Sequence, residues 1–242
     1  MSYQRMAEVY DRLMQDAPYN KWVTWTRHMI KKHRPRTKYV LDLGCGTGEI
    51  TTRLAQTYQM TGVDLSEDML AIASTKDDRR TIQWLRQDIT RLTGLSNYDC
   101  IISYCDVINY IIKEEDLLLV FQHAYEALDS EGLFLFDVHS LPHINNDLIG
   151  RTFAEVYDDL SYIWFCDEGS VPGEFEHELT FFIRNGEVFE RFDETHYQKG
   201  YSPLYLKEEL IKAGFSILGV YADFSDVSAD EGERLFFVCL KK

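Results

Sequence analysis

The stretch YVLDLGCGTG, residues 39–48, decides the fold of this 242-residue chain. Its first five residues are typical of a short buried strand, and three glycines at alternate positions follow. A helical segment is predicted from Glu49 to Tyr58. A strand that passes through a glycine-rich turn into a helix lets a ligand approach the backbone closely.

The same alternation of strand and helix continues after this turn. Strands are predicted at Met60–Leu65, Thr81–Arg86, Tyr98–Tyr104 and Gly132–Asp137, and a helix at Glu114–Leu128. Such alternation builds an α/β fold, a parallel sheet with helices on both faces. Ligands of these sheets bind beyond the carboxyl ends of the strands. We therefore expect the glycine turn, Asp64, Asp88, Asp106 and Asp137 to meet at one crevice.

Residues 141–200 interrupt this alternation with strand-type sequence. Within them, Asn185-Gly186 separates two strand-like runs and predicts a β-hairpin. A two-residue turn there would place Arg184 opposite Glu187 and His177 opposite Glu194. One face of the hairpin would then carry His177, Leu179, Phe181, Glu190, Phe192, Glu194 and His196. We predict a core of residues 1–140 and 201–242, and an antiparallel β lid over the substrate at 141–200.

Charge and cysteine spacing limit the classes of function. The formal net charge is −15, so the chain repels nucleic acid. The longest apolar stretch, Cys100–Ile112, is too short to span a membrane, and the N-terminus lacks the apolar core of a signal peptide, so we expect a cytoplasmic protein. Five scattered cysteines without a CxxC pair favour free thiols. His139 and His143 are separated by Pro142, and no metal site is expected.

The residues around the glycines also discriminate between cofactors. Dinucleotide sites use G-x-G-x-x-G and place a pyrophosphate on the helix N-terminus. Here the sixth position is Glu49, and Asp42 precedes the glycines. Two acids beside the turn would repel phosphate and favour a cation.

At these residues the chain resembles the class I S-adenosylmethionine-dependent methyltransferases, whose Asp/Glu-x-Gly-x-Gly-x-Gly turn cradles the amino-acid end of the cofactor. Asp64-Leu65 resembles the ribose-binding acid with its adenine-packing neighbour, and Asp88-Ile89 resembles the adenine-edge pair. The resemblance implies a Rossmann-like seven-stranded sheet with its last strand antiparallel and the lid inserted after the fifth strand. The cofactor contacts it implies are Asp42, Gly44, Cys45, Gly46, Gly48, Asp64, Leu65, Met69, Asp88, Ile89 and Cys105.

Shorter segments resemble a bacterial branch of small methyltransferases. These segments are Tyr10-Asp11, 106–110, 136–139, 162–164 and 194–196. Membership in that branch does not name a substrate. A small-molecule methyl acceptor is expected, whose nucleophilic atom is oxygen, nitrogen or carbon.

Direct methyl transfer needs an in-line nucleophile, a dry site and sometimes a base. Our first candidate base is His196, although a structural lid histidine fits the same pattern. Asp106 and His139, at strand ends, are the other catalytic candidates, and Asp106 could instead position substrate. Substrate contacts are expected from Tyr10, Asn109, His177 and Glu194.

Two other classes of protein remain open at this point. A nicotinamide-dependent oxidoreductase would need a helix start that accepts phosphate, which Glu49 opposes. A module that binds the cofactor without turnover would share every motif above. The sequence also leaves open whether the chain forms a homodimer.

Overall fold

The computed structural model describes residues 2–229 and 231–242, with residues 2–6 and 8 as backbone alone. Its main sheet has seven strands in the order β10-β11-β5-β4-β1-β2-β3. The strands are β1 (Tyr39–Leu43), β2 (Gln59–Asp64), β3 (Gln83–Arg86), β4 (Tyr98–Ser103), β5 (Leu128–His139), β10 (Phe215–Ala222) and β11 (Arg234–Lys241). β11 runs antiparallel to both β5 and β10, and the pairs among β1 to β5 are parallel. The predicted fold is confirmed.

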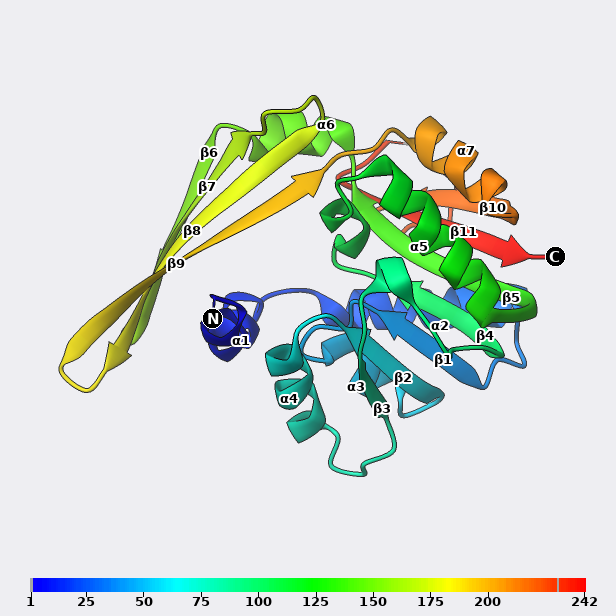
Figure 1. Ribbon diagram of the computed structural model, residues 1–242, viewed down its shortest axis with the longest axis horizontal. Helices are drawn as coiled ribbons and strands as arrows, with labels where there is room; N and C mark the ends of the chain where they lie inside the picture. The colour runs from blue at the N-terminus through cyan, green and yellow to red at the C-terminus, as the bar shows by residue number, and fades with distance from the viewer. Residues whose placement is uncertain (1, 230) are drawn as a thin grey trace.

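Helices cover both faces of this sheet (Figure 1). On one face, α5 (Glu114–Ala127) and α7 (Pro203–Lys212) pack against a core that includes Phe121, Phe134 and Phe136. On the other face, α2 (Tyr19–His33) and α3 (Glu49–Leu54) pack against Val40, Ile102 and Phe236. Because both faces are covered, the central strands are buried along nearly their whole length.

A second, four-stranded antiparallel sheet follows β5 and stands out from the core as a long arm (Figure 1). After α6 (Leu141–His143) and the short helix η3 (Ile144–Leu148), it runs through β6 (Arg151–Val156), β7 (Leu160–Glu168), β8 (Glu174–Asn185) and β9 (Val188–Lys199). We call it sheet B. Its inner face buries Phe175, His177 and Phe181, whereas Ile163 and Phe165 on the outer face are exposed.

Helix α1 (Ser2–Leu13) lies between sheet B and α4 (Glu67–Lys76). Its Ala7 and Val9 share one apolar cluster with Met69 of α4 and Phe181 of sheet B. Arg12 donates two hydrogen bonds, of 2.9 and 2.7 Å, to Asp159 in the turn between β6 and β7. The N-terminal helix therefore bridges α4, beside the main sheet, and sheet B.

The hairpin register differs from the prediction by two residues. Asn185 pairs with Val188, so the turn residues are Gly186 and Glu187, and His177 lies opposite His196 rather than Glu194. The turn needs a positive φ at its first residue, and Gly186 supplies it with φ 65°. Because the register differs by an even number of residues, the side chains stay on the predicted face, and Glu194 and His196 are indeed buried.

Within the part of the chain that the structure describes, no helix is long and apolar enough to cross a membrane. All five cysteines are free thiols.

Candidate functional site

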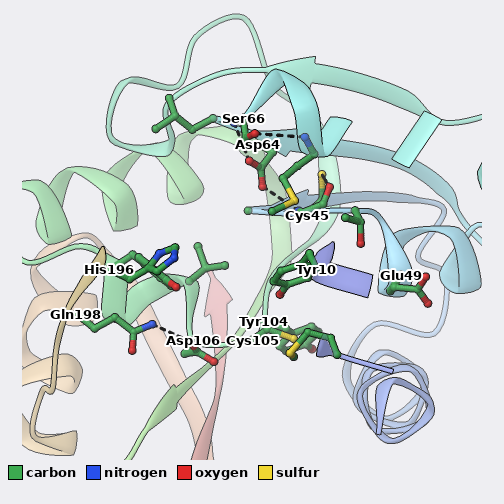
Figure 2. Close-up of a pocket in the computed structure, with 18 of the residues that line it drawn as sticks. Tyr10, Cys45, Glu49, Asp64, Ser66, Tyr104, Cys105, Asp106, His196 and Gln198 are labelled. Carbon is green, nitrogen blue, oxygen red and sulfur yellow. Dashed lines mark hydrogen bonds between the residues drawn. The ribbon is translucent and has the colours of Figure 1, made fainter. Parts of the chain in front are cut away.

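A cavity of about 1050 Å³ lies between the glycine turn of the main sheet and the inner face of sheet B. Figure 2 shows Cys45, Asp64 and Ser66 at one end, and Asp106, His196 and Gln198 at the other. The first end is built by the carboxyl ends of β1 and β2, as predicted for a parallel sheet. The second end is built by residues after β4 and β5 together with sheet B.

The glycine turn presents bare backbone to the cavity. Gly44 and Gly46 have φ of +75° and +53°, which side-chain-bearing residues rarely adopt. A Cβ atom on Gly44 would lie 2.6 Å from Val107, whereas a Cβ on Gly46 would meet nothing within 4 Å. The space at Gly46 therefore belongs to the cavity, and a ligand can reach the backbone there.

Asp64 follows the turn at the end of β2 and accepts two backbone hydrogen bonds. Its Oδ2 accepts from the Gly46 N–H and its Oδ1 from the Ser66 N–H, both at 2.8 Å. Burial raises the pKa of Asp64, against the effect of these hydrogen bonds. Each carboxylate oxygen keeps a further lone pair, so Asp64 can accept from two neighbouring hydroxyls of a ribose.

Residues beside Asp64 provide an apolar slot. Leu65 lines the cavity with 61% of its surface exposed, and the nearly buried Met69 and Ile89 line it as well. At the rim, Asp88 Oδ1 accepts from the N–H and the hydroxyl of Thr90. The other oxygen, Asp88 Oδ2, is thus the one that could accept a hydrogen bond from an amino group. An apolar slot with a polar edge fits an adenine ring.

The two acids that flank the glycines behave differently. Asp42 is buried, accepts a 2.5 Å hydrogen bond from the Thr51 hydroxyl, and has a pKa raised to about 7 by burial. Glu49 is paired with Lys76 at 2.7 Å and with Arg53. The prediction that Glu49 itself makes the turn attractive to a cation is therefore wrong, because its charge is already compensated. Asp42 and Asp64 remain as the acids of this end.

Asp106 occupies the other end of the cavity, just after β4. It and Cys105 both adopt left-handed backbone conformations, with φ of 56° and 59°. The Asp106 N–H donates to Asp137 Oδ1 at 3.0 Å, which supports this strained turn. Burial opposes ionisation of Asp106, but His139, Arg234 and Gln198 outweigh it, and its pKa lies well below the usual range. Asp106 is a carboxylate.

A directional chain of hydrogen bonds links sheet B to Asp106. The Trp164 indole N–H donates to His177 Nδ1 at 2.9 Å, and His177 Nε2 contacts Gln198 Oε1 at 3.2 Å. Gln198 Nε2 then donates to Asp106 Oδ2 at 2.9 Å. Because an indole can only donate, His177 must be neutral with its proton on Nε2. Burial lowers the pKa of His177, in agreement with this state.

Arg234 completes the polar cluster below Asp106. Its guanidinium lies 3.1 Å from Asp106 Oδ1 and 3.1 Å from Asp137 Oδ1. His139 Nε2 lies 3.4 Å from the same Asp106 oxygen. Trp22, from α2, donates to Asp137 Oδ2 at 2.6 Å, so this residue belongs to the core.

His196 lines the cavity beside Tyr110. Their ring centroids are 5.9 Å apart in an edge-to-face arrangement. Burial, followed by the neighbouring His177, lowers the pKa of His196. Tyr10 and Tyr19 also line the cavity, and burial raises the pKa of both phenols.

The structure brings most of the predicted site residues together, with three exceptions. Asn109 is fully buried away from the cavity, where its amide donates to Lys199 O and accepts from the His139 N–H. Glu194 is buried opposite Leu179 and is not part of the cavity wall. Gly48 closes the turn through a hydrogen bond from its N–H to Cys45 O. Their predicted ligand contacts are therefore not supported.

Sequence reasoning missed Gln198, Trp164 and Arg234. Gln198 shares its strand face with His196, so the period-two alternation could have found it. Arg234 lies opposite His139 in the register of β11 and β5, a pairing between distant segments that no local pattern reports. His177 was predicted to lie opposite Glu194, but its hydrogen-bond partners are Trp164 and Gln198.

The seven-stranded sheet with an antiparallel last strand, the bare glycine turn and the acid at the end of β2 together define a class I S-adenosylmethionine-dependent methyltransferase. A family model described as a methyltransferase domain matches residues 40–132. A relative from Geobacillus sp. (strain WCH70), named a "putative methyltransferase", is 43% identical over 250 residues that cover both chains completely. The chain belongs to this methyltransferase family.

Solved structures agree with this assignment. An S-adenosylmethionine-dependent methyltransferase from Clostridium acetobutylicum superposes with a TM-score of 0.89 at 28% identity, covering 100% of this chain and 99% of the other. An amino pentose methyltransferase from Micromonospora echinaspora, with S-adenosylmethionine bound, has a TM-score of 0.80 at 14% identity over 97% of both chains. The second likeness shows the fold alone. The predicted cofactor class is confirmed.

Proposed function

We propose that this chain transfers the methyl group of S-adenosylmethionine directly to a small molecule held between the main sheet and sheet B. The observation that carries the proposal is the continuous cavity of about 1050 Å³, which joins the glycine turn to the inner face of sheet B. Ligand cavities of about 300–1,000 Å³ enclose one drug-sized molecule. The cavity therefore has room for a cofactor and a small acceptor together.

The first end of the cavity fits the cofactor. Asp64 would hold the ribose hydroxyls, and Leu65, Met69 and Ile89 would enclose the adenine, with Asp88 at its edge. When bound, S-adenosylmethionine supplies an electrophilic methyl group on a positively charged sulfur. The carboxylates of this end favour such a cation over a dinucleotide phosphate.

The acceptor end of the cavity provides orientation, exclusion of water and a base. Trp164, Phe153 and Tyr162 form aromatic walls from sheet B. His196 is our proposed base, because it lines the cavity and burial favours its neutral form. Asp106 is a poor base at neutral pH, because its pKa lies far below that pH. We assign Asp106 to positioning, with His139 beside it.

We propose that residues 141–200 act as the lid over the acceptor, and that residues 1–140 and 201–242 bind the cofactor. In this division the lid contributes Trp164, His177, His196 and Gln198 to the cavity. The core contributes the glycine turn and Asp106. Each part alone would hold only one of the two reactants.

The proposal is tested by giving the enzyme a donor with a labelled methyl group and a bacterial extract split by ultrafiltration. We expect label to enter small molecules of the filtrate and not the retained protein or nucleic acid. Label confined to the retained fraction would contradict a small-molecule acceptor. Binding of S-adenosylhomocysteine with no labelled product in either fraction would favour a module that binds without turnover.

A further inference from the structure

We infer that the methyl acceptor is an amine, which enters the cavity as an ammonium ion. This inference rests on the proposed function and adds the substrate class. It depends on three features of the acceptor end: every described cationic group there is already paired, His177 and His196 are neutral, and aromatic side chains line the same cavity as the Asp106 carboxylate.

Every cationic group that lines the described part of the cavity is already paired, so none is available to bind an anionic acceptor. Arg86 is paired with Glu67 at 2.9 Å, and Arg234 lies between Asp106 and Asp137. His139 contacts Asp106, and His143 contacts Asp147 at 3.1 Å. A carboxylate or phosphate acceptor would lose its hydration without gaining a counter-ion, which is costly in a buried site.

The other two histidines of the cavity do not supply a positive charge either. His177 accepts from Trp164 and is therefore held in its neutral form. His196 lies opposite His177 on the neighbouring strand and is buried, and burial disfavours its charged form. A neutral imidazole in a substrate cavity can accept a proton, and this is the role that an amine acceptor requires.

Carboxylates outnumber cations along the cavity. Its described lining includes seven Asp and Glu side chains but only two Arg and no Lys. Glu49, Glu67 and Asp106 are paired with cations, but the remaining acids leave this wall with an excess of negative charge, which raises the local concentration of cations. At the acceptor end, Tyr10, Tyr110 and Trp164 line the same cavity as Asp106. Aromatic faces beside a carboxylate form a typical binding site for an ammonium group.

The chemistry balances without a further reactant. The ammonium gives one proton to His196, and the nitrogen lone pair then forms a bond to the methyl carbon. The carbon–sulfur bond breaks, and its electron pair stays on sulfur as a neutral thioether. The product leaves as a methylammonium ion, and His196 returns its proton to water.

The test uses the enzyme, a donor with a CD3 group and the small-molecule filtrate of a bacterial extract. Labelled products are found by mass spectrometry and classed by their linkage. We expect products that survive alkali and lose a CD3-amine on fragmentation. Esters that alkali cleaves, ethers that lose CD3-alcohol, or C-methyl products would overturn the amine inference and leave the proposed function intact. No labelled product at all would overturn both.

A pair of variants tests the role of Asp106 in binding the acceptor that the labelling experiment identifies. Asp106→Asn should raise the KM for the amine about tenfold to a hundredfold, because a charge-assisted contact is lost. Its affinity for S-adenosylhomocysteine should stay unchanged, which also shows that the variant folds. Asp193→Asn is the control, since this carboxylate is paired with Arg191 on the outer face of sheet B and is 57% exposed. Equal KM values in the two variants would contradict the inference.

Discussion

At the residue scale, three aspartates of one cavity differ in ionisation because their surroundings differ. Asp42 has one hydroxyl donor and is otherwise buried, so its pKa rises to about 7. Asp64 has two backbone donors and its pKa is also raised by burial. Asp106 contacts Arg234, His139 and Gln198, and it stays ionised. The same side chain is thus suited to three different tasks.

Asp64→Ala should weaken the binding of S-adenosylhomocysteine by about 1.5–3 kcal/mol, the usual contribution of a hydrogen bond to a charged group. Titration calorimetry measures this directly. The variant also leaves the N–H groups of Gly46 and Ser66 without their acceptor. Asp193→Ala, on the outer face of sheet B, is the control and should bind normally. An unchanged dissociation constant for Asp64→Ala would contradict the proposal that Asp64 binds the ribose hydroxyls.

Asp42 should make the ligand-free protein less stable as pH rises. Its pKa is about 7 in the folded chain and 3.8 in the reference state, so the folded chain holds a proton that the unfolded chain loses. Stability therefore falls between about pH 4 and pH 7, by a few kcal/mol at most. Asp42→Asn removes this loss. In urea unfolding, the free energy of unfolding of the variant relative to the original chain should be higher at pH 8 than at pH 5. An equal difference at the two pH values would contradict a protonated Asp42 in the folded chain.

At the element scale, the sequence predicted the strands of the main sheet to within a few residues, because periodicity and glycines are local signals. The strand Tyr39–Leu43 is confirmed. The register of the hairpin was wrong because Asn-Gly does not say which residue opens the turn. The pairing of Arg234 with Asp106 joins residues 128 positions apart, and local patterns carry no record of it.

Gly186→Ala should destabilise the β8–β9 hairpin by about 1–2 kcal/mol, because φ is 65° at this position. No atom lies within 4 Å of the added Cβ, so the cost comes from the backbone alone. Gly186→Asn should cost less, since Asn tolerates this conformation. Hydrogen exchange should accelerate in β8 and β9 near the tip and stay unchanged in β1 to β5. Equal exchange in the Ala and Asn variants would contradict this account.

At the scale of the whole molecule, Gln198 is a buried link between the main sheet and sheet B. It lies on β9. Its Oε1 accepts a hydrogen bond from His177 Nε2, and its Nε2 donates one to Asp106 Oδ2. Helix α1 provides a second link through Arg12 and Asp159, but both of these side chains are well exposed. An exposed pair contributes little, whereas the buried Gln198 contact involves a charge.

Gln198→Leu should detach the base of sheet B from the core while keeping the volume of the side chain. We expect faster hydrogen exchange in β8 and β9 near His177 and His196, and altered fluorescence from Trp164. Binding of S-adenosylhomocysteine should stay normal, because the glycine turn lies at the other end of the cavity. Tyr197→Leu, on the exposed face of the same strand, is the control. Identical exchange in both variants would contradict a linking role.

The most direct test of the whole account is a crystal structure of this chain with S-adenosylhomocysteine. We expect the ribose hydroxyls on Asp64, the adenine against Leu65, and the sulfur directed toward Asp106 and the inner face of sheet B. A sulfur that points away from sheet B, or a ligand bound elsewhere than the glycine turn, would contradict the claim that one cavity brings donor and acceptor together.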